Sequence, residues 1–253
     1  MLSLLALIAL QPTSEIETPP KELAKNFYTK MVKFQGMPIL GSPKVEDAAL
    51  IQMKATFEKM LAKVPEGTMK ALVDSGCHYS IIAEEEGQTD LPEYHHLKND
   101  PNMDWNKRAR GLGGKYTSGG EENILELASD RYRGESIYIH EFAHTLDMFG
   151  FSKVVPKFRE ELSDAFNKAK AEGLWKDTYA ITNRGEYWAE GVQSYFDCNR
   201  IADPPNGIHN AIGNRDRLKK YDPRLFALID RCFGSNPWRY EGKYATTNLP
   251  PVK

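Results

Sequence analysis

Two histidines and a glutamate lie close together in the middle of the chain. His140, Glu141 and His144 form the pattern His-Glu-x-x-His. On an α-helix, residues four apart share one face, so the two imidazoles can bind one metal ion. Zinc suits this pair because neutral imidazole is one of its preferred ligands. Glu141 follows the first histidine, where its carboxylate can take a proton from a water on the metal. The spacing therefore indicates metal-assisted hydrolysis.

Two further carboxylates follow later in the chain. Glu186 and Glu190 lie four residues apart in a segment, 184–198, whose other residues are largely aromatic or apolar and have helical spacing. Two carboxylates on one face of a buried helix are costly unless they are paired or bound to metal. A catalytic zinc needs a third protein ligand besides the two histidines. This helix can supply that ligand; the alternative is a solvated polar stripe.

Elements of regular structure must position these residues. The motif is surrounded by apolar residues, with Gly134 and Gly150 as start and stop of a predicted helix. A strand predicted over 123–127 would border the cleft, and its edge could pair with an extended peptide. Further helices are predicted over 21–34, 45–64, 156–173 and 222–233, and a strand over 78–85. His95 and His96 fall in a polar loop, 87–106, where adjacent histidines are usually solvated.

Composition restricts the class of protein. The chain has 253 residues, 41% of them hydrophobic, with 33 basic and 35 acidic side chains. This is enough for one large domain or two small ones. A net charge of −2 offers no reason to expect a nucleic-acid partner. No segment approaches the ~20 apolar residues of a membrane span.

The N-terminus and the cysteines bear on localisation. Residues 1–10 are nearly all apolar and are followed by polar QPTSEIETPP. They are typical of a secretory signal that lacks its basic leader; the alternative is a short helix or strand that packs on the domain. We therefore predict a signal peptide or disordered N-terminus over 1–18, a single domain over 19–253, and a secreted or periplasmic protein. A disulfide between Cys198 and Cys232 and buried free thiols both remain open.

Two segments resemble a known family. HEFAHTLD at 140–147 and TYAITNRGEYWAEGVQSYFD at 178–197 resemble the gluzincin zinc metallopeptidases, and among them the catalytic domain of anthrax lethal factor. The resemblance covers about Ser136 to Asp197 and does not extend to the residues before it. It implies that Zn²⁺ is bound by His140, His144 and Glu186, and that Glu141 is the general base.

The same resemblance implies roles for three more residues. Glu190 would orient a ligand histidine, and Asp147 would support the ligands from outside. Tyr179 lies seven residues before Glu186, where the family has a tyrosine that donates to the oxyanion. His209, outside the resemblance, is either a second donor of this kind or a surface-loop histidine.

Together these observations predict an α+β, zincin-like metallopeptidase domain with a small mixed sheet, an HExxH helix and a downstream glutamate helix. The predicted function is that of a monomeric zinc-dependent endopeptidase acting on a peptide or protein substrate. The alternative is a catalytically inactive zinc-containing protein that serves in binding or surface interaction.

Overall fold

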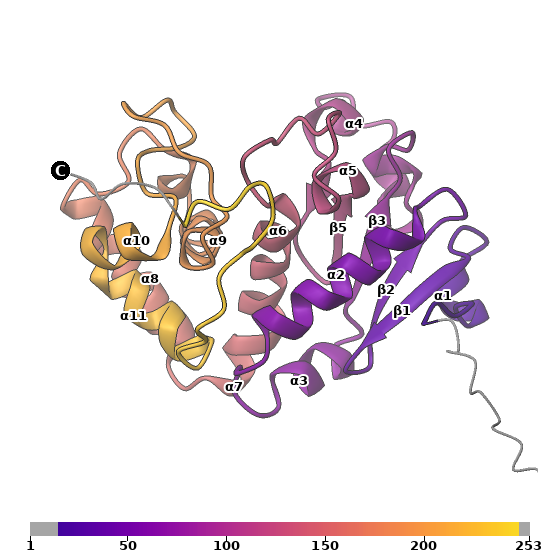
Figure 1. The fold of residues 1–253 in the computed structure, drawn as a ribbon, viewed down its shortest axis with the longest axis horizontal. Coiled ribbons are helices and arrows are strands. Elements are labelled where there is room, and N and C mark those ends of the chain that lie inside the picture. The colour runs from indigo at the N-terminus through magenta and orange to yellow at the C-terminus, as the bar shows by residue number, and fades with distance from the viewer. Residues whose placement is uncertain (1–14, 248–253) are drawn as a thin grey trace, which may run out of the picture.

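A five-stranded mixed sheet forms the N-terminal half of the molecule in this computed structural model, which describes residues 15–247 (Figure 1). Its strands lie in the order β1-β2-β3-β5-β4, where β2, β3 and β5 are parallel and the two outer strands are antiparallel to their neighbours. The strands are β1 (Lys30–Phe34), β2 (Met37–Gly41), β3 (His78–Ile82), β4 (Gly111–Leu112) and β5 (Tyr116–Gly120). The predicted small mixed sheet is confirmed, as is the strand beginning at His78.

The first predicted helix, 21–34, is wrong. Only α1 (Lys21–Ala24) is helical, and the chain then enters a hairpin formed by β1 and β2. Gln35 and Gly36 connect these strands with φ of 46° and 87°, the conformation of a two-residue hairpin turn. Leu23, Phe27 and Met31 do share one apolar cluster, so their spacing reports real burial in a structure that is not a helix.

The predicted strand over 123–127 is also wrong, because the strand lies earlier. β5 ends at Gly120, and the following residues form the short helix α5 (Glu121–Ile124). Gly119 is required within β5, since a Cβ there would lie 2.2 Å from the hydroxyl oxygen of Tyr79 on β3. The glycines of this segment therefore permit close packing within a buried sheet.

Helices surround the sheet and form the C-terminal half. The longer ones are α2 (Asp47–Met60), α3 (Thr68–Asp74), α6 (Ile137–Thr145), α8 (Phe158–Ala171), α9 (Arg184–Tyr195), α10 (Arg215–Tyr221) and α11 (Pro223–Cys232); α4 (Trp105–Arg108) and α7 (Ser152–Val154) are short. The predicted helices corresponding to α2, α8, α9 and α11 are confirmed. In Figure 1, α6 lies between the sheet and the C-terminal helices.

The helix that carries the histidine motif continues beyond its predicted end. After Thr145 it widens into a π-helical segment, Leu146–Phe151, and then passes into α7. Gly150 is therefore inside the helical segment and is not its stop. Such π-helical turns are frequent at functional sites.

One large apolar core joins the two halves. It includes Val32 of β1 and Tyr240 near the C-terminus, and Phe57 of α2 stacks on Phe142 of α6 with ring centroids 4.2 Å apart. Cys77, Cys198 and Cys232 are all buried free thiols, so a Cys198–Cys232 disulfide is absent from the described structure. Of the predicted signal segment 1–18, residues 1–14 lie outside the described residues.

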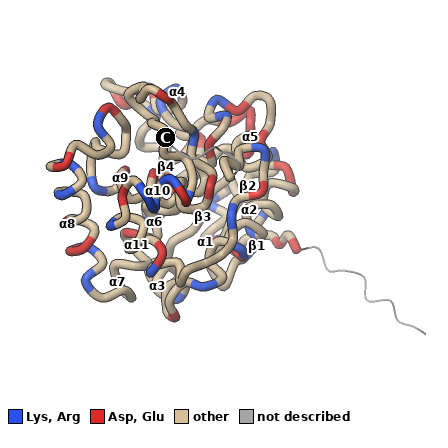
Figure 2. The backbone as a smooth tube through the Cα atoms, turned by 60° about the vertical axis from the view of Figure 1, so that its left-hand side comes forward, with Lys and Arg blue, Asp and Glu red and all other residues tan. Residues whose placement is uncertain are grey.

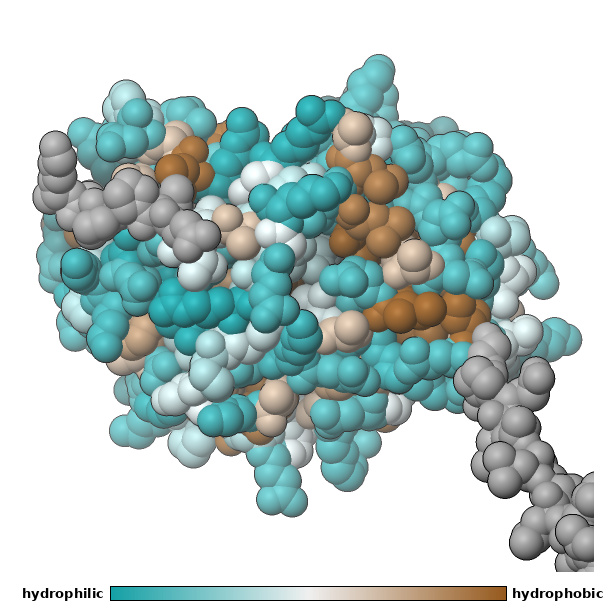
Figure 3. Space-filling model, in the orientation of Figure 1, coloured by the Kyte–Doolittle hydropathy of each residue, from teal (hydrophilic) through white to brown (hydrophobic). Residues whose placement is uncertain are grey.

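The surface is mixed in character. Apolar side chains on the face shown in Figure 3 form small separate patches among polar ones. Basic and acidic residues are interspersed along the described chain (Figure 2). Within residues 15–247 no helix combines the length and the hydropathy needed to cross a membrane. A monomeric state stays a prediction.

Candidate metal centre

α6 is fixed at its start by a residue from outside the helix. The side-chain oxygen of Asn123 in α5 accepts hydrogen bonds from the backbone N–H groups of Ile137, at 2.8 Å, and Tyr138, at 3.4 Å. These are two of the donors that a helix N-terminus leaves without an internal partner. Asn123 itself is held by Asp130 and by the backbone oxygen of Glu135. The segment wrongly predicted as a strand thus caps the histidine helix.

α9 is positioned against α6 by its own cap and by a tryptophan. The side-chain oxygen of Asn183 accepts a hydrogen bond from the backbone N–H of Glu186, which begins the helix. The indole N–H of Trp188 donates to the backbone oxygen of Ala143 at 2.9 Å. Trp188 is fully buried, so this bond joins the two helices in a place without water.

Three side-chain atoms from these two helices converge. His140 Nε2 lies 3.0 Å from Glu186 Oε2, His144 Nε2 lies 3.3 Å from the same oxygen, and the two histidine nitrogens are 3.2 Å apart. Among the described residues, this trio is the one group of histidine, cysteine and carboxylate side chains close enough to hold a metal ion. The structure brings together the three predicted ligands.

The dimensions and chemistry of the trio fit zinc. Ligand atoms about 2.0–2.1 Å from a tetrahedral ion lie roughly 3.4 Å from one another, close to the three separations found here. Two imidazoles and one carboxylate form the ligand set of several catalytic zinc sites, which keep a fourth position open. The three residues therefore fit the metal that the sequence predicts.

The charges around the trio also favour a cation. Burial lowers the pKa of His140, but its hydrogen bond with Glu186 and the charges of the neighbouring carboxylates outweigh this effect and raise the pKa to about 10. Burial raises the pKa of Glu186, while hydrogen bonds with His140 and His144 hold it well below its usual range. The surroundings thus stabilise positive charge at the position where the metal would bind.

Gln193 is a residue that sequence reasoning missed. Its side-chain oxygen lies 2.8 Å from His140 Nδ1, and its amide nitrogen donates to the backbone oxygen of Ser136 at 3.1 Å. Nδ1 then carries the proton, and Nε2 presents its lone pair to the metal. The available signal was spacing, because Gln193 lies seven residues after Glu186 and so on the same helix face.

Glu190 is buried near His140 without being hydrogen-bonded to it. Its Oε1 lies 3.7 Å from His140 Nδ1, and its Oε2 accepts a hydrogen bond from Asn199 at 2.8 Å. The distance is too long for a hydrogen bond but short enough for its charge to act on the imidazole. The orienting role predicted for Glu190 therefore stays a proposal. The residue in direct contact with His140 Nδ1 is Gln193.

Asp147 lies in the π-helical segment just after His144. It is buried, and its Oδ1 has no hydrogen-bond partner. Burial raises its pKa, whereas the charges of Arg184, Arg159 and His144 lower it. Asp147 is thus within electrostatic reach of the ligand His144, with no hydrogen bond between the two side chains, so its supporting role also stays a proposal.

Glu141 lies between the metal trio and the outer edge of the sheet. A Cβ on Gly111 of β4 would lie 3.0 Å from Glu141 Cγ, and one on Gly113 would lie 2.8 Å from the backbone oxygen of Glu141 and 2.6 Å from His144 Cβ. The absence of a side chain at Gly113 therefore allows the backbone next to β4 to pack directly against the histidine motif of α6. Burial raises the pKa of Glu141, as suits a proton acceptor that must also donate.

Tyr179 approaches the site from the short helix Tyr179–Ile181 that precedes α9. Burial raises the pKa of its hydroxyl, the charges of Glu186 and Glu141 raise it further, and a hydrogen bond with Arg108 lowers it. The phenol thus lies within electrostatic reach of a predicted ligand and of the predicted base. Arg108, at the end of α4, is a neighbour that sequence reasoning missed.

His209 lies at a buried contact with Glu135. Its Nε2 is 3.5 Å from Glu135 Oε1, and its Nδ1 has no hydrogen-bond partner. Because it is buried, the interpretation as a surface-loop histidine is wrong. His95 Nε2 donates a hydrogen bond to the backbone oxygen of Asp90, and His95 takes no part in the trio.

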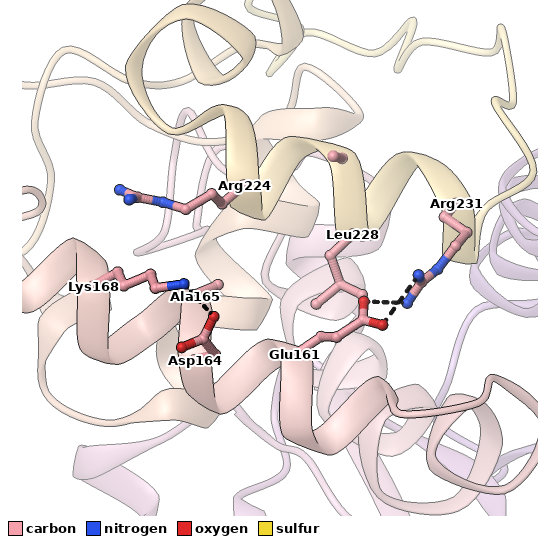
Figure 4. Close-up of a pocket in the computed structure, with 8 residues that line it drawn as sticks. Glu161, Asp164, Ala165, Lys168, Arg224, Leu228 and Arg231 are labelled. Atoms are coloured by element: carbon pink, nitrogen blue, oxygen red, sulfur yellow. Dashed lines mark hydrogen bonds and ion pairs between the residues drawn. The ribbon is translucent and has the colours of Figure 1, made fainter.

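A hollow of about 270 Å³ lies elsewhere, between α8 and α11 (Figure 4). Its floor includes Ala165 and Leu228, and its charged rim is largely paired, as with Arg231 and Glu161 at 2.5 Å. None of its lining residues belongs to the metal trio. Because its charged residues are largely paired with one another, the hollow is not a candidate active site.

Taken together, a small mixed sheet, a His-Glu-x-x-His helix beneath its edge strand and a later glutamate helix define a zincin-like α+β metallopeptidase fold. The family model of the anthrax toxin lethal factor, N- and C-terminal domain, matches residues 29–232. The chain belongs to the anthrax toxin lethal factor family, and the resemblance noted in its sequence is confirmed. The expectation that the likeness does not extend before Ser136 is wrong, because the match begins at residue 29.

The chain is also similar to a solved structure. The Pro-Pro endopeptidase PPEP-2 from Paenibacillus alvei is 17% identical, with a TM-score of 0.49, over 76% of this chain and 96% of that chain. At this distance the likeness does not assign a substrate. A comparison with curated protein sequences finds no match.

Proposed function

We propose that this chain is a zinc-dependent endopeptidase. The observation that carries the proposal is the triangle of His140 Nε2, His144 Nε2 and Glu186 Oε2, whose sides of 3.0–3.3 Å suit one zinc ion. Zinc held there would polarise the scissile carbonyl and lower the pKa of a water molecule toward ~7. Membership of the lethal factor family supports this assignment.

Glu141 would move the proton. Its carboxylate lies beside the trio and under the edge strand, where it can take a proton from the attacking water and return it to the leaving nitrogen. Burial raises the pKa of Glu141, so its protonated form is more stable than that of an ordinary surface carboxylate. The protonated form is then available as the acid of the second step.

Tyr179 and β4 would bind the substrate. The Tyr179 hydroxyl would donate a hydrogen bond to the carbonyl oxygen as that oxygen gains negative charge. β4 is the outer strand of the sheet, so its backbone can pair with an extended peptide. Backbone pairing would hold the chain across the trio without demanding a particular sequence.

The test is digestion of a random peptide library, read by mass spectrometry, with zinc-loaded protein and with protein treated with a chelator. We expect cleavage that the chelator abolishes and added zinc restores. Glu141→Gln should retain zinc and lose cleavage, because an amide cannot accept the proton. Zinc retention without cleavage by the parent protein would instead favour a catalytically inactive binding protein.

A further inference from the structure

We propose that the cleft prefers substrates with an acidic side chain near the scissile bond, and that Arg108, Arg131 and Arg200 select them. The inference rests on the proposed peptidase function and names the class of substrate for it. All three arginines are exposed; Arg108 ends the short helix α4, and Arg131 and Arg200 lie on loops. Guanidinium groups bind carboxylates through two parallel hydrogen bonds, so they suit this role.

The first two arginines are held together by contacts between their loops. Arg131 Nη1 donates to the backbone oxygen of Lys107 at 2.7 Å, which joins the segment before α6 to the end of α4. The guanidinium of Arg131 also lies over the ring of Tyr132, 5.2 Å from its centroid. These contacts fix Arg131 beside Arg108 and limit the side-chain entropy that binding would cost.

Tyr132 and Tyr179 show that this pair borders the catalytic groups. Burial raises the pKa of Tyr132, the charges of Arg131 and Arg108 lower it, and the charge of Glu141 raises it. The hydroxyl of Tyr179 is likewise within reach of both Arg108 and Glu141. Each phenol is therefore within electrostatic reach of an arginine and of the predicted base. Arg108 also lies three residues before Gly111, where a Cβ would be 3.0 Å from Glu141 Cγ, so the arginine pair borders the same site.

Arg200 lies on the neighbouring loop. Its side-chain Cγ would be 3.7 Å from a Cβ on Gly134. Gly134 lies two residues before Ser136, the N-cap residue of α6. Its charge lowers the pKa of His209, the buried histidine whose pKa the charge of Glu190 raises. Arg200 thus extends the positive wall along the N-terminal end of α6.

These cations are available to a ligand. In residues 15–247, Arg108, Arg131 and Arg200 form no ion pair with a carboxylate. Neighbouring Lys107 is different, because it pairs with Asp104 at 3.0 Å. The arginines of the hollow between α8 and α11 are also paired with glutamates: Arg224 with Glu172, and Arg231 with Glu161, as Figure 4 shows. With charges of both signs interspersed elsewhere (Figure 2), selection by charge must come from such local groups.

The experiment uses two peptide libraries that differ at one position near the centre, which is Asp or Glu in one and Asn or Gln in the other. For the zinc-loaded parent we expect kcat/KM to be about 3–10-fold higher with the acidic library, the effect of one or two partly exposed ion pairs. The preference should shrink as salt is raised, because exposed charges are screened. The double variant Arg131→Gln/Arg200→Gln, which retains Arg108, should reduce the ratio by about half or more.

Lys220→Gln is the matched control. It removes an exposed positive charge on α10 and should leave the acidic-to-neutral ratio unchanged. Equal cleavage of both libraries by the parent would overturn the inference and leave the peptidase function intact. The absence of cleavage in either library would instead count against the proposed function. An acidic-to-neutral ratio that is unchanged in the double variant would also overturn the assignment to these arginines.

Discussion

The imidazole of His140 is held at both of its nitrogens. Nε2 faces Glu186 and His144, and Nδ1 lies 2.8 Å from the side-chain oxygen of Gln193. A neutral amide can orient the ring without adding charge, while the buried carboxylate of Glu190 acts from 3.7 Å. These contacts fix the orientation of the ring so that Nε2 faces the metal position.

Gln193→Ala should weaken zinc affinity about 10–100-fold, the usual cost of removing a group that orients a ligand. Glu190→Gln should cost less, since its carboxylate makes no hydrogen bond with His140. Glu186→Ala removes a ligand and should abolish tight binding. Titration against a chromophoric chelator measures all three. A greater loss in Glu190→Gln than in Gln193→Ala would reverse the roles that we assign to these side chains.

Tyr179→Phe should lower kcat about 10²–10³-fold, by analogy with the loss of one oxyanion donor. The phenol would stabilise charge that develops in the transition state, so the effect should fall on kcat and not on zinc affinity. Steady-state kinetics at equal zinc content provide the measurement. A kcat within about threefold of the parent would assign Tyr179 to packing alone.

At the scale of elements, the site depends on close approach between β4 and α6. Gly113 permits it, because any side chain there would collide with His144. Asn123 holds the start of α6, and Trp188 bonds α9 to it. The motif residues were predicted because their spacing is local, whereas this support comes from segments distant in the chain, which periodicity does not reveal.

The errors in the predicted elements have the same origin. Leu23, Phe27 and Met31 have helical spacing, yet tertiary pairing places Met31 in a strand, and the turn at Gln35 and Gly36 closes a hairpin. Gly119 and Gly120 suggest a turn in the sequence but lie in a buried strand. Gly119 makes room for the side chain of Tyr79. The sequence alone cannot distinguish such a glycine from a glycine in a turn, because Tyr79 is distant in the chain.

Glu93 anchors the 3₁₀ segment Pro92–Leu97, which leads toward α4 and Arg108, to the sheet. It contacts Tyr28, Lys25 and His78 at 2.5, 2.9 and 3.1 Å. Burial raises the pKa of Glu93, but these partners outweigh burial and lower it from 4.5 to about 2. The stabilisation is thus complete above pH 4.5 and is lost as pH falls toward 2.

From this shift we expect Glu93 to contribute about 3 kcal/mol at neutral pH. Glu93→Gln should lose most of that contribution at pH 7 and should differ less from the parent at pH 3. Urea unfolding followed at several pH values is the measurement. A stability difference that does not shrink as pH falls would show that charge is not what Glu93 supplies.

At the scale of the whole molecule, the metal site joins two halves of the chain. His140 and His144 lie on the helix beside the sheet, and Glu186 lies on a helix of the C-terminal half (Figure 1). Because a ligand that binds only the folded state stabilises it, free zinc at 100 times its Kd should add about 2.7 kcal/mol. A chelator should therefore lower Tm, by about 5–10 °C for a chain of this size.

The most direct test of the account is a zinc titration of metal-free protein in which peptide cleavage and bound metal are measured together. We predict that the cleavage rate rises linearly and reaches a plateau at about one zinc per chain. Glu186→Ala, tested in parallel, should show neither tight binding nor cleavage over the same range. Cleavage that does not depend on zinc, or one tightly bound zinc per chain without cleavage of any peptide, would contradict it.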